Sequence, residues 1–317
     1  MNAQDKTTII KKQANNFSEF EETVSEFKNL YKSKITTLRP VFRGAQERIN
    51  ASRYLQPSIK WNNLVQFENE LVSEMKRLKP MDFNMGGLDL IAKLQHYGLP
   101  TRLLDFSLSS YVALYFAVKD VLKYDQGAVS KVYCLGARIS DITAETIAQI
   151  PEKLQPHMFG KDKNFFIEDI LFSNINESER SPSIKEFLHK VFTTNIFTSP
   201  KFYTGRELNQ QSVFMIFCNN VIDRHGIIRF DSDDWEEQID KEPTLCKRFY
   251  FDSNVKNIIM NNSEKNALWE IEISHSAVPE IKSKLNELGI NAPFLFPDDI
   301  ERAAIYVLEN VKNKYIP

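Results

Sequence analysis

The polar residues with the clearest chemical potential lie at 93–105, which reads KLQHYGLPTRLLD, just ahead of an apolar segment at 111–118. This stretch contains His96, Arg102 and Asp105. Ionised side chains are costly to bury without a partner. These side chains therefore either pair with one another to lock a turn or line a pocket where the apolar helix begins. The stretch as a whole favours a functional role, although His96 by itself fits a structural histidine better.

A second candidate is Arg43, which follows two apolar residues and precedes Gly44. A guanidinium presents a fixed fork of donors that suits a phosphate or a carboxylate. Glycine allows a ligand or a backbone segment to approach closely. Two interpretations remain open: Arg43 holds a pyrophosphate, or it pairs with a buried carboxylate such as Asp105. Asp105 could equally orient Arg102, and Tyr97 could stack on a flat ring.

Composition limits the classes of function. The chain has 317 residues, 42% of them hydrophobic, and a net charge of −2, so no overall basic signature for nucleic acid is present. Three scattered cysteines and five histidines lack the spacing of a metal or redox site, and no metal is expected. We find no dinucleotide fingerprint and no P-loop. Neither a signal-like N-terminus nor a run of about 18 apolar residues is found, so we expect a cytoplasmic protein without a membrane segment.

Periodicity predicts an α+β fold, because short strands and helices do not alternate regularly. Residues 141–200 have helical fragments and turns, and we interpret them as an insertion. Helices are predicted at 17–31, 64–78, 87–97, 111–118, 278–288 and 298–312, and strands at 40–44, 101–106, 129–135, 213–218, 227–230, 247–251 and 268–273.

Some polar and aromatic residues are predicted to be structural. Glu68 lies on a helix with Lys76 and Arg77, a pattern typical of a solvated face. Phe294 and Phe296 are predicted to enter the core, and an aspartate at 298–299 is predicted to cap the final helix.

The motifs VFRG (41–44) and HYGLPTRLLD (96–105) resemble the FRG-domain family, named for its Phe/Tyr-Arg-Gly motif. Three further segments look similar to the family's later motifs: GAVSKVYCL (127–135), RELNQQSVF (206–214) and FLFPDDIERAA (294–304). The resemblance implies an FRG domain over residues 40–312, preceded by a helical extension at 1–39.

A weaker similarity connects DFSLSSYVALYFA (105–117) with a strand–helix element of ADP-ribosyltransferase folds. This likeness implies a mixed or antiparallel split sheet with flanking helices and a site for NAD. In those enzymes a later strand begins with a catalytic glutamate. Here Gln210, Gln211 and Ser212 occupy that place, and Glu207 lies three residues before Gln210. A glutamine can hydrogen-bond a ribose hydroxyl but lacks the charge that stabilises a cation.

The likeness to ADP-ribosyltransferases implies roles for particular residues. Arg43 would hold the pyrophosphate or the nicotinamide ribose, His96 and Tyr97 would flank the nicotinamide, and Gln210 with Glu207 would face the ribose. The catalytic set would be Arg43, His96, Gln210 and Glu207, and the NAD-binding set would be Arg43, Gly44, His96, Tyr97, Thr101, Arg102 and Asp105.

Two classes of function follow from this reading. The first is a nucleotide-binding protein that hydrolyses NAD or transfers ADP-ribose to a macromolecular target, as a toxin or a phage-defence protein would. The second is a non-catalytic module that binds a phosphate ligand or a protein partner. The sequence does not decide whether the chain is an enzyme, and it does not define an oligomeric state.

Overall fold

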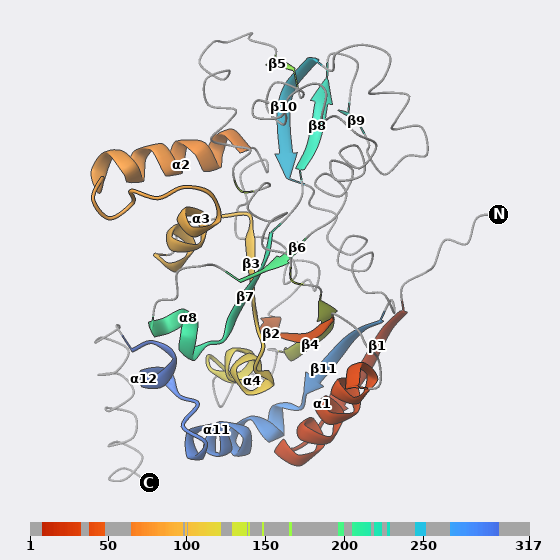
Figure 1. Cartoon of the computed structure of the whole chain (residues 1–317). Coiled ribbons are helices and arrows are strands. Elements are labelled where there is room, and N and C mark those ends of the chain that lie inside the picture. Colours follow the sequence, from red (N-terminus) through yellow and green to blue (C-terminus); the bar gives the residue numbers. More distant parts are fainter. Residues whose placement is uncertain are drawn as a thin grey trace, which may run out of the picture.

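The computed structural model describes residues 8–32, 38–47, 65–97, 99, 101–121, 129–137, 139, 148, 165–166, 196–199, 205–216, 219–223, 227–228, 245–251 and 267–297. Within these residues the chain forms two sheets with helices packed around the larger one (Figure 1). The predicted α+β class is therefore confirmed. The predicted helix at 298–312, its cap at 298–299 and most of the predicted insertion at 141–200 lie outside the described residues.

The larger sheet has seven strands and is mixed. Strands β1 and β11 are parallel, and the other neighbouring pairs are antiparallel. In spatial order the strands are β1 (Thr8–Ala14), β11 (Ala267–Ile273), β4 (Val129–Ala137), β2 (Arg39–Glu47), β3 (Leu103–Ser107), β7 (Ser212–Ile216) and β6 (Ile196–Thr198).

The smaller sheet is antiparallel and lies at the top of Figure 1. Its order is β5 (Phe165–Phe166), β10 (Leu245–Phe251), β8 (Asn219–Asp223) and β9 (Ile227–Ile228).

Three helices share one core with the larger sheet: α1 (Phe17–Lys32), α4 (Ser110–Val118) and α11 (Val278–Glu287), the last preceded by a 3₁₀ turn at His275–Ala277. The periodic aromatic residues of α1 are buried there, as their spacing predicts. Phe27 packs edge-on against both Phe42 and Trp269, with ring centroids 6.0 and 5.5 Å apart. Figure 1 shows α1 lying beside β1 and β11.

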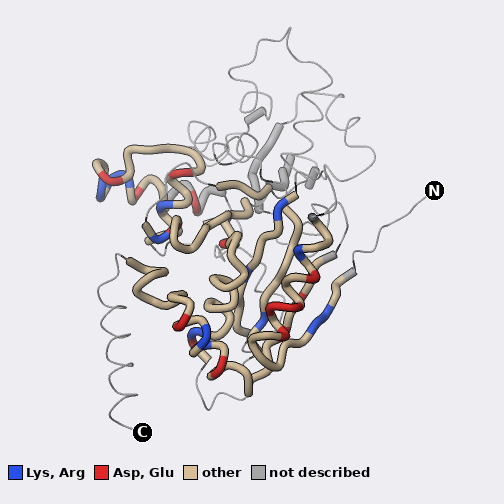
Figure 2. The backbone as a smooth tube through the Cα atoms, turned by 60° about the horizontal axis from the view of Figure 1, so that its bottom comes forward, with Lys and Arg blue, Asp and Glu red and all other residues tan. Residues whose placement is uncertain are grey.

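The remaining helices are α2 (Val65–Leu78), α3 (Gly87–His96), α8 (Gly205–Asn209) and α12 (Ala292–Leu295). Among the described residues, no helix combines the length and the apolar character needed to cross a bilayer. Basic and acidic residues are interspersed along the described backbone (Figure 2).

The N-terminal segment predicted at 1–39 as a helical extension also contains a strand. β1 pairs with β11 from Thr8 to Ala14, so this segment belongs to the main sheet. The prediction missed β1 because its sequence, TIIKKQA, alternates poorly between apolar and polar residues. It is an edge strand, and edge strands tolerate such polar residues.

The large apolar residues Leu78 and Phe294 are exposed, and Phe294 was predicted to enter the core. Leu78, at the end of α2, is 58% exposed, and Phe294 is 42% exposed, whereas Phe296 is buried as predicted. Leu78 occupies the last position of its helix.

Strand β2 and helix α4 touch through their backbones at Gly44. A Cβ atom at this position would lie 1.7 Å from the carbonyl oxygen of Ala113 and 2.6 Å from the amide nitrogen of Ala117. Ser109 fixes where the helix begins, because its side chain accepts a hydrogen bond from the amide of Val112. Gly44 therefore admits a backbone segment, which was one of its two predicted uses.

Strands β2 and β3 are joined through a single residue pair, Phe42 with Ser107. Beyond that pair β2 continues along β4 to Glu47, while β3 runs along β7. The sheet is continuous in strand order but opens into a wedge between residues 43–47 and 103–106.

Replacing Gly44 by alanine is predicted to lower the free energy of unfolding by about 3 kcal/mol, because neither backbone group near the new methyl can move independently. Gly289→Ala is the matched control. Gly289 has φ +76° with open space around its Cα, so only its backbone conformation opposes alanine, at a cost of about 1 kcal/mol. Urea denaturation measures the free energy of unfolding of both variants. Equal losses of this free energy in the two variants would contradict the packing argument.

Candidate functional site

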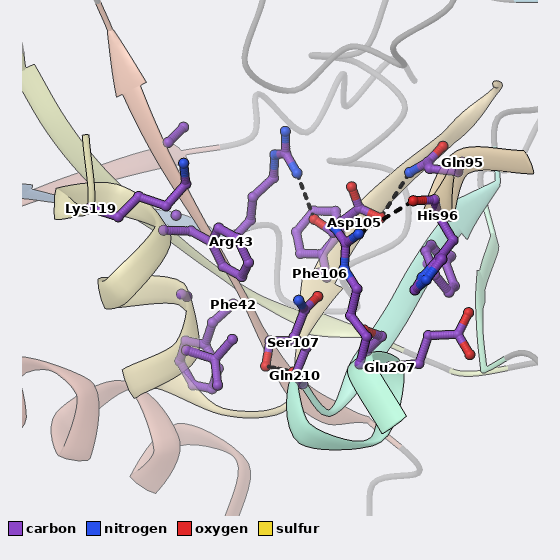
Figure 3. Close-up of a pocket in the computed structure, with 18 of the residues that line it drawn as sticks. Phe42, Arg43, Gln95, His96, Asp105, Phe106, Ser107, Lys119, Glu207 and Gln210 are labelled. Atoms are coloured by element: carbon purple, nitrogen blue, oxygen red, sulfur yellow. Dashed lines mark hydrogen bonds between the residues drawn. The ribbon is translucent and has the colours of Figure 1, made fainter. Parts of the chain in front are cut away.

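A pocket of about 350 Å³ occupies the wedge between β2 and β3 (Figure 3). This volume lies within the range of sites for small molecules. Besides the two strands, its walls come from the ends of α3 and α4, from α8 and from the start of β7. The described residues contain no group of three or more His, Cys, Asp or Glu side chains that could hold a metal ion.

Arg43 reaches across the wedge from β2. Its Nη1 donates to the carbonyl oxygen of Asp105 at 2.7 Å (Figure 3). Burial lowers the pKa of Arg43, because a dehydrated guanidinium favours loss of its charge, while the charge of Asp105 and then that of Tyr133 oppose this effect. A bound anion would also counteract this lowering of the Arg43 pKa, and the charge of the guanidinium would in turn stabilise the anion.

The carboxylate of Asp105 is held from α3. Gln95 donates from Nε2 to Oδ1 of Asp105 at 2.8 Å, and its Oε1 accepts a hydrogen bond from the hydroxyl of Thr101. Thr101 is buried and is not among the residues that line the pocket. Its hydroxyl also accepts from the amide of Leu103 at 3.1 Å. Thr101 therefore positions the wall behind Asp105.

His96 and Tyr97 are separated by the end of α3. His96 lines the pocket, whereas Tyr97 is 65% exposed and does not line it. The two rings meet edge-on with centroids 5.4 Å apart. A ligand in the pocket would therefore meet His96 before Tyr97.

Arg102 points away from the pocket and is fully buried against α2. Its Nε donates to Oε1 of Glu68 at 3.0 Å, and its backbone amide donates to Oε2 at 3.3 Å. The prediction that Glu68 lies on a solvated face is wrong, since Glu68 is only 1% exposed. Apolar periodicity cannot identify a buried glutamate whose partner lies on a distant segment.

Glu207 lines the pocket from α8, and Gln210 lines it from the turn between α8 and β7. The side chain of Gln210 donates to the carbonyl of Leu295 at 3.0 Å, while its own carbonyl accepts from the hydroxyl of Ser107 at 2.7 Å. Glu207 is 6% exposed. Gln211, which follows Gln210, adopts the left-handed backbone region with φ +48°. The turn between α8 and β7 is thus held both by its bond to Leu295 and by its bond to Ser107.

The C-terminal segment 294–296 clasps α8. Asn209 donates to the carbonyl of Phe294 at 2.6 Å, next to the bond from Gln210 to Leu295. The guanidinium of Arg206 lies 4.8 Å from the ring centre of Phe296 and donates to the carbonyl of His96 at 3.3 Å. These contacts connect α8 to both α3 and the C-terminal segment.

The pocket brings together the four catalytic candidates and two further binding candidates, but not all that the sequence suggested. Arg43, Gly44, His96, Asp105, Glu207 and Gln210 line it, whereas Tyr97, Thr101 and Arg102 do not. Lining residues that the sequence prediction missed include Gln46, Lys119, Asp120 and Arg206. Arg206 opens the RELNQQSVF segment and Lys119 follows the apolar helix, so their positions beside motifs were the available signal.

Residues 38–126 match the family model of the FRG domain. The chain contains an FRG domain. The match begins two residues before the predicted start at residue 40 and covers β2, α2, α3, β3 and α4, which carry Arg43, His96 and Asp105. The matched range thus supplies both strands that bound the wedge, while the segments at 127–135, 206–214 and 294–304 lie outside it. No curated protein and no solved structure matches the chain.

Replacing Arg102 by methionine is predicted to lower the free energy of unfolding by about 3–5 kcal/mol, because Glu68 would remain as a buried charge without its partner. The double variant Arg102→Met with Glu68→Leu should recover much of that loss, because it removes both charges. Arg77→Met, which breaks the exposed pair with Glu74, is the control and should change little. A stable Arg102→Met protein with impaired ligand binding would instead assign Arg102 to the pocket.

Proposed function

We propose that the pocket of the FRG domain binds a nucleotide, with NAD as its leading candidate. The observation that carries this proposal is the placement of Arg43, a guanidinium whose burial lowers its pKa, at the wall of a pocket large enough for a small molecule. A phosphate offers a guanidinium two parallel charged hydrogen bonds.

The distribution of charge favours NAD over a purely anionic ligand. In Figure 3, Arg43 and Lys119 lie on one side of the pocket, while Asp105 and Glu207 lie on the other. NAD carries an anionic pyrophosphate and a cationic nicotinamide ring. The charge of Lys119 is paired with that of Asp120, so a pyrophosphate near Arg43 would leave the nicotinamide facing the other two carboxylates.

The same arrangement supports chemistry at the nicotinamide ribose. When the bond between C1′ and nicotinamide breaks, the ribose acquires positive charge and nicotinamide leaves with the bonding electron pair. A carboxylate at Glu207 would stabilise that charge. Water adds to C1′ and releases a proton, which gives ADP-ribose, or a nucleophile on a macromolecular target adds instead. The opening of the sheet between β2 and β3 supports an ADP-ribosyltransferase-like arrangement. An enzyme that consumes NAD in the cytoplasm would suit a toxin or a phage-defence protein.

One observation favours a second candidate, a binding module without catalysis. The amide nitrogen of Gln210, at the position where ADP-ribosyltransferases place a catalytic glutamate, is bonded to the carbonyl of Leu295. Gln210 then has a structural role, and the pocket recognises a phosphate ligand through Arg43.

Binding of NAD is predicted to be about tenfold tighter than binding of NADH, because NADH lacks the positive charge on its ring; this factor equals about 1.4 kcal/mol. Arg43→Met should weaken NAD, NADH and inorganic pyrophosphate alike by at least about tenfold, the scale of a charged hydrogen bond. Lys284→Met, a surface cation paired with Glu287, is the matched control. Calorimetric titration measures the affinity of each protein for all three ligands. A large fall in melting midpoint for Arg43→Met would assign Arg43 to holding the sheet together.

If the chain is an enzyme, Glu207→Gln is predicted to reduce the release of nicotinamide from NAD by about a hundredfold, the usual scale for loss of one group that stabilises transition-state charge. NAD affinity should change far less, because the charge on C1′ develops only during the reaction. Nicotinamide is measured by chromatography. Binding by the wild type with no release, even with cell extract as a source of targets, would leave the binding module as the function.

A further inference from the structure

Gln46 carries a buried polar group that the fold does not use. It lies on β2 three residues after Arg43 and lines the same pocket. Its side-chain Nε2 is buried and has no hydrogen-bond partner in the part of the chain that the structure describes. A buried amide donor without an acceptor is destabilising, and native structures seldom contain one without a reason. A ligand that fills the pocket would supply the missing acceptor.

The neighbouring strand offers an acceptor that Gln46 does not use. Ser130 lies directly opposite Gln46 in the pairing of β2 with β4, and its hydroxyl is also buried and without a described partner. Side chains of directly opposed residues lie close enough to interact. A glutamine with a purely structural role would donate to this hydroxyl. The amide instead remains available at the pocket.

Gln46 and Arg43 project to opposite sides of β2. Side chains alternate along a strand, so Gln46 shares a face with Phe42 and Gly44, the residues that pack against α4. Arg43 shares the other face with Val41 and Ala45. Both faces reach one pocket because β3 leaves β2 after Phe42. A ligand that contacts both residues must therefore pass through the wedge.

The α4 side of the pocket is close to neutral. The pocket residues at the end of α4 are Lys119 and Asp120, whose side chains bond to each other. This environment suits an uncharged group that accepts a hydrogen bond, whereas the desolvated Arg43 suits the phosphates. An amide also matches the donor and acceptor groups on the edge of a nucleobase.

We propose that Gln46 is a specificity-determining residue that reads the nucleoside end of the ligand, by donating a hydrogen bond to an acceptor on its base or ribose. The proposal rests on the proposed nucleotide function and deepens it. The ligand then lies across the edge of β2, with its phosphates on the Arg43 side and its nucleoside on the α4 side. This placement explains why a donor is kept buried at a cost to the unbound protein.

The test compares ADP with inorganic pyrophosphate, two probes that differ in the nucleoside. Gln46→Leu should weaken ADP binding by about tenfold, the scale of one hydrogen bond, and leave pyrophosphate binding unchanged. Arg43→Met should weaken both probes. The melting midpoint of unliganded Gln46→Leu should stay level or rise, because the variant no longer buries an unsatisfied donor.

The outcomes separate this inference from the proposed function. If the wild type binds both probes and Gln46→Leu binds ADP with unchanged affinity, the proposed role of Gln46 is wrong. The proposed nucleotide pocket would then still hold. A Gln46→Leu protein with a lowered melting midpoint and equal losses for both probes would make the glutamine structural. If the wild type bound neither probe nor NAD, both proposals would fall together.

Discussion

The contact between the backbone of β2 at Gly44 and the backbone of α4 determines how the rest of the site is arranged. The carbonyl of Ala113 occupies the space of a missing side chain, so the helix lies directly on the strand. With α4 in that place, β3, which leads into it, meets β2 only at Phe42 and Ser107. The sheet then opens, and the resulting wedge holds Arg43. A pocket in this fold is thus a consequence of close packing beside it.

The walls of the wedge are held by polar side-chain bonds rather than by a continuous ladder. Arg102 and Glu68 connect the start of β3 to α2, and Gln95 connects Asp105 to α3. Such bonds are directional, and breaking the buried bond of Arg102 to Glu68 would leave a charge without water. They therefore position the side chains at the pocket more narrowly than apolar packing would. Nonpolar clusters on both faces of the sheet provide the bulk of the burial.

Local signals predicted the elements that carry their own pattern. The aromatic spacing of α1 and the motif around Arg43 could be recognised from the sequence, and so could six of the residues that line the pocket. The partners that these elements find on distant segments could not be recognised from the sequence. Glu68 was misplaced because its cation lies 34 residues away, and β1 was missed because its place in the sheet depends on β11 near the other end of the chain. Gln46 gave no signal, because a missing hydrogen bond is visible only in three dimensions.

The clasp between α8 and residues 294–296 has a consequence for synthesis of the chain. Its hydrogen bonds join residues 85 positions apart, and β1 pairs with β11 across a still longer interval. A chain emerging from the ribosome can place α4 on β2 early, since those segments are near neighbours in sequence. The wall formed by α8 waits until residue 296 has left the exit tunnel. Shorter nascent chains therefore lack the contacts that connect α8 to residues 294–296.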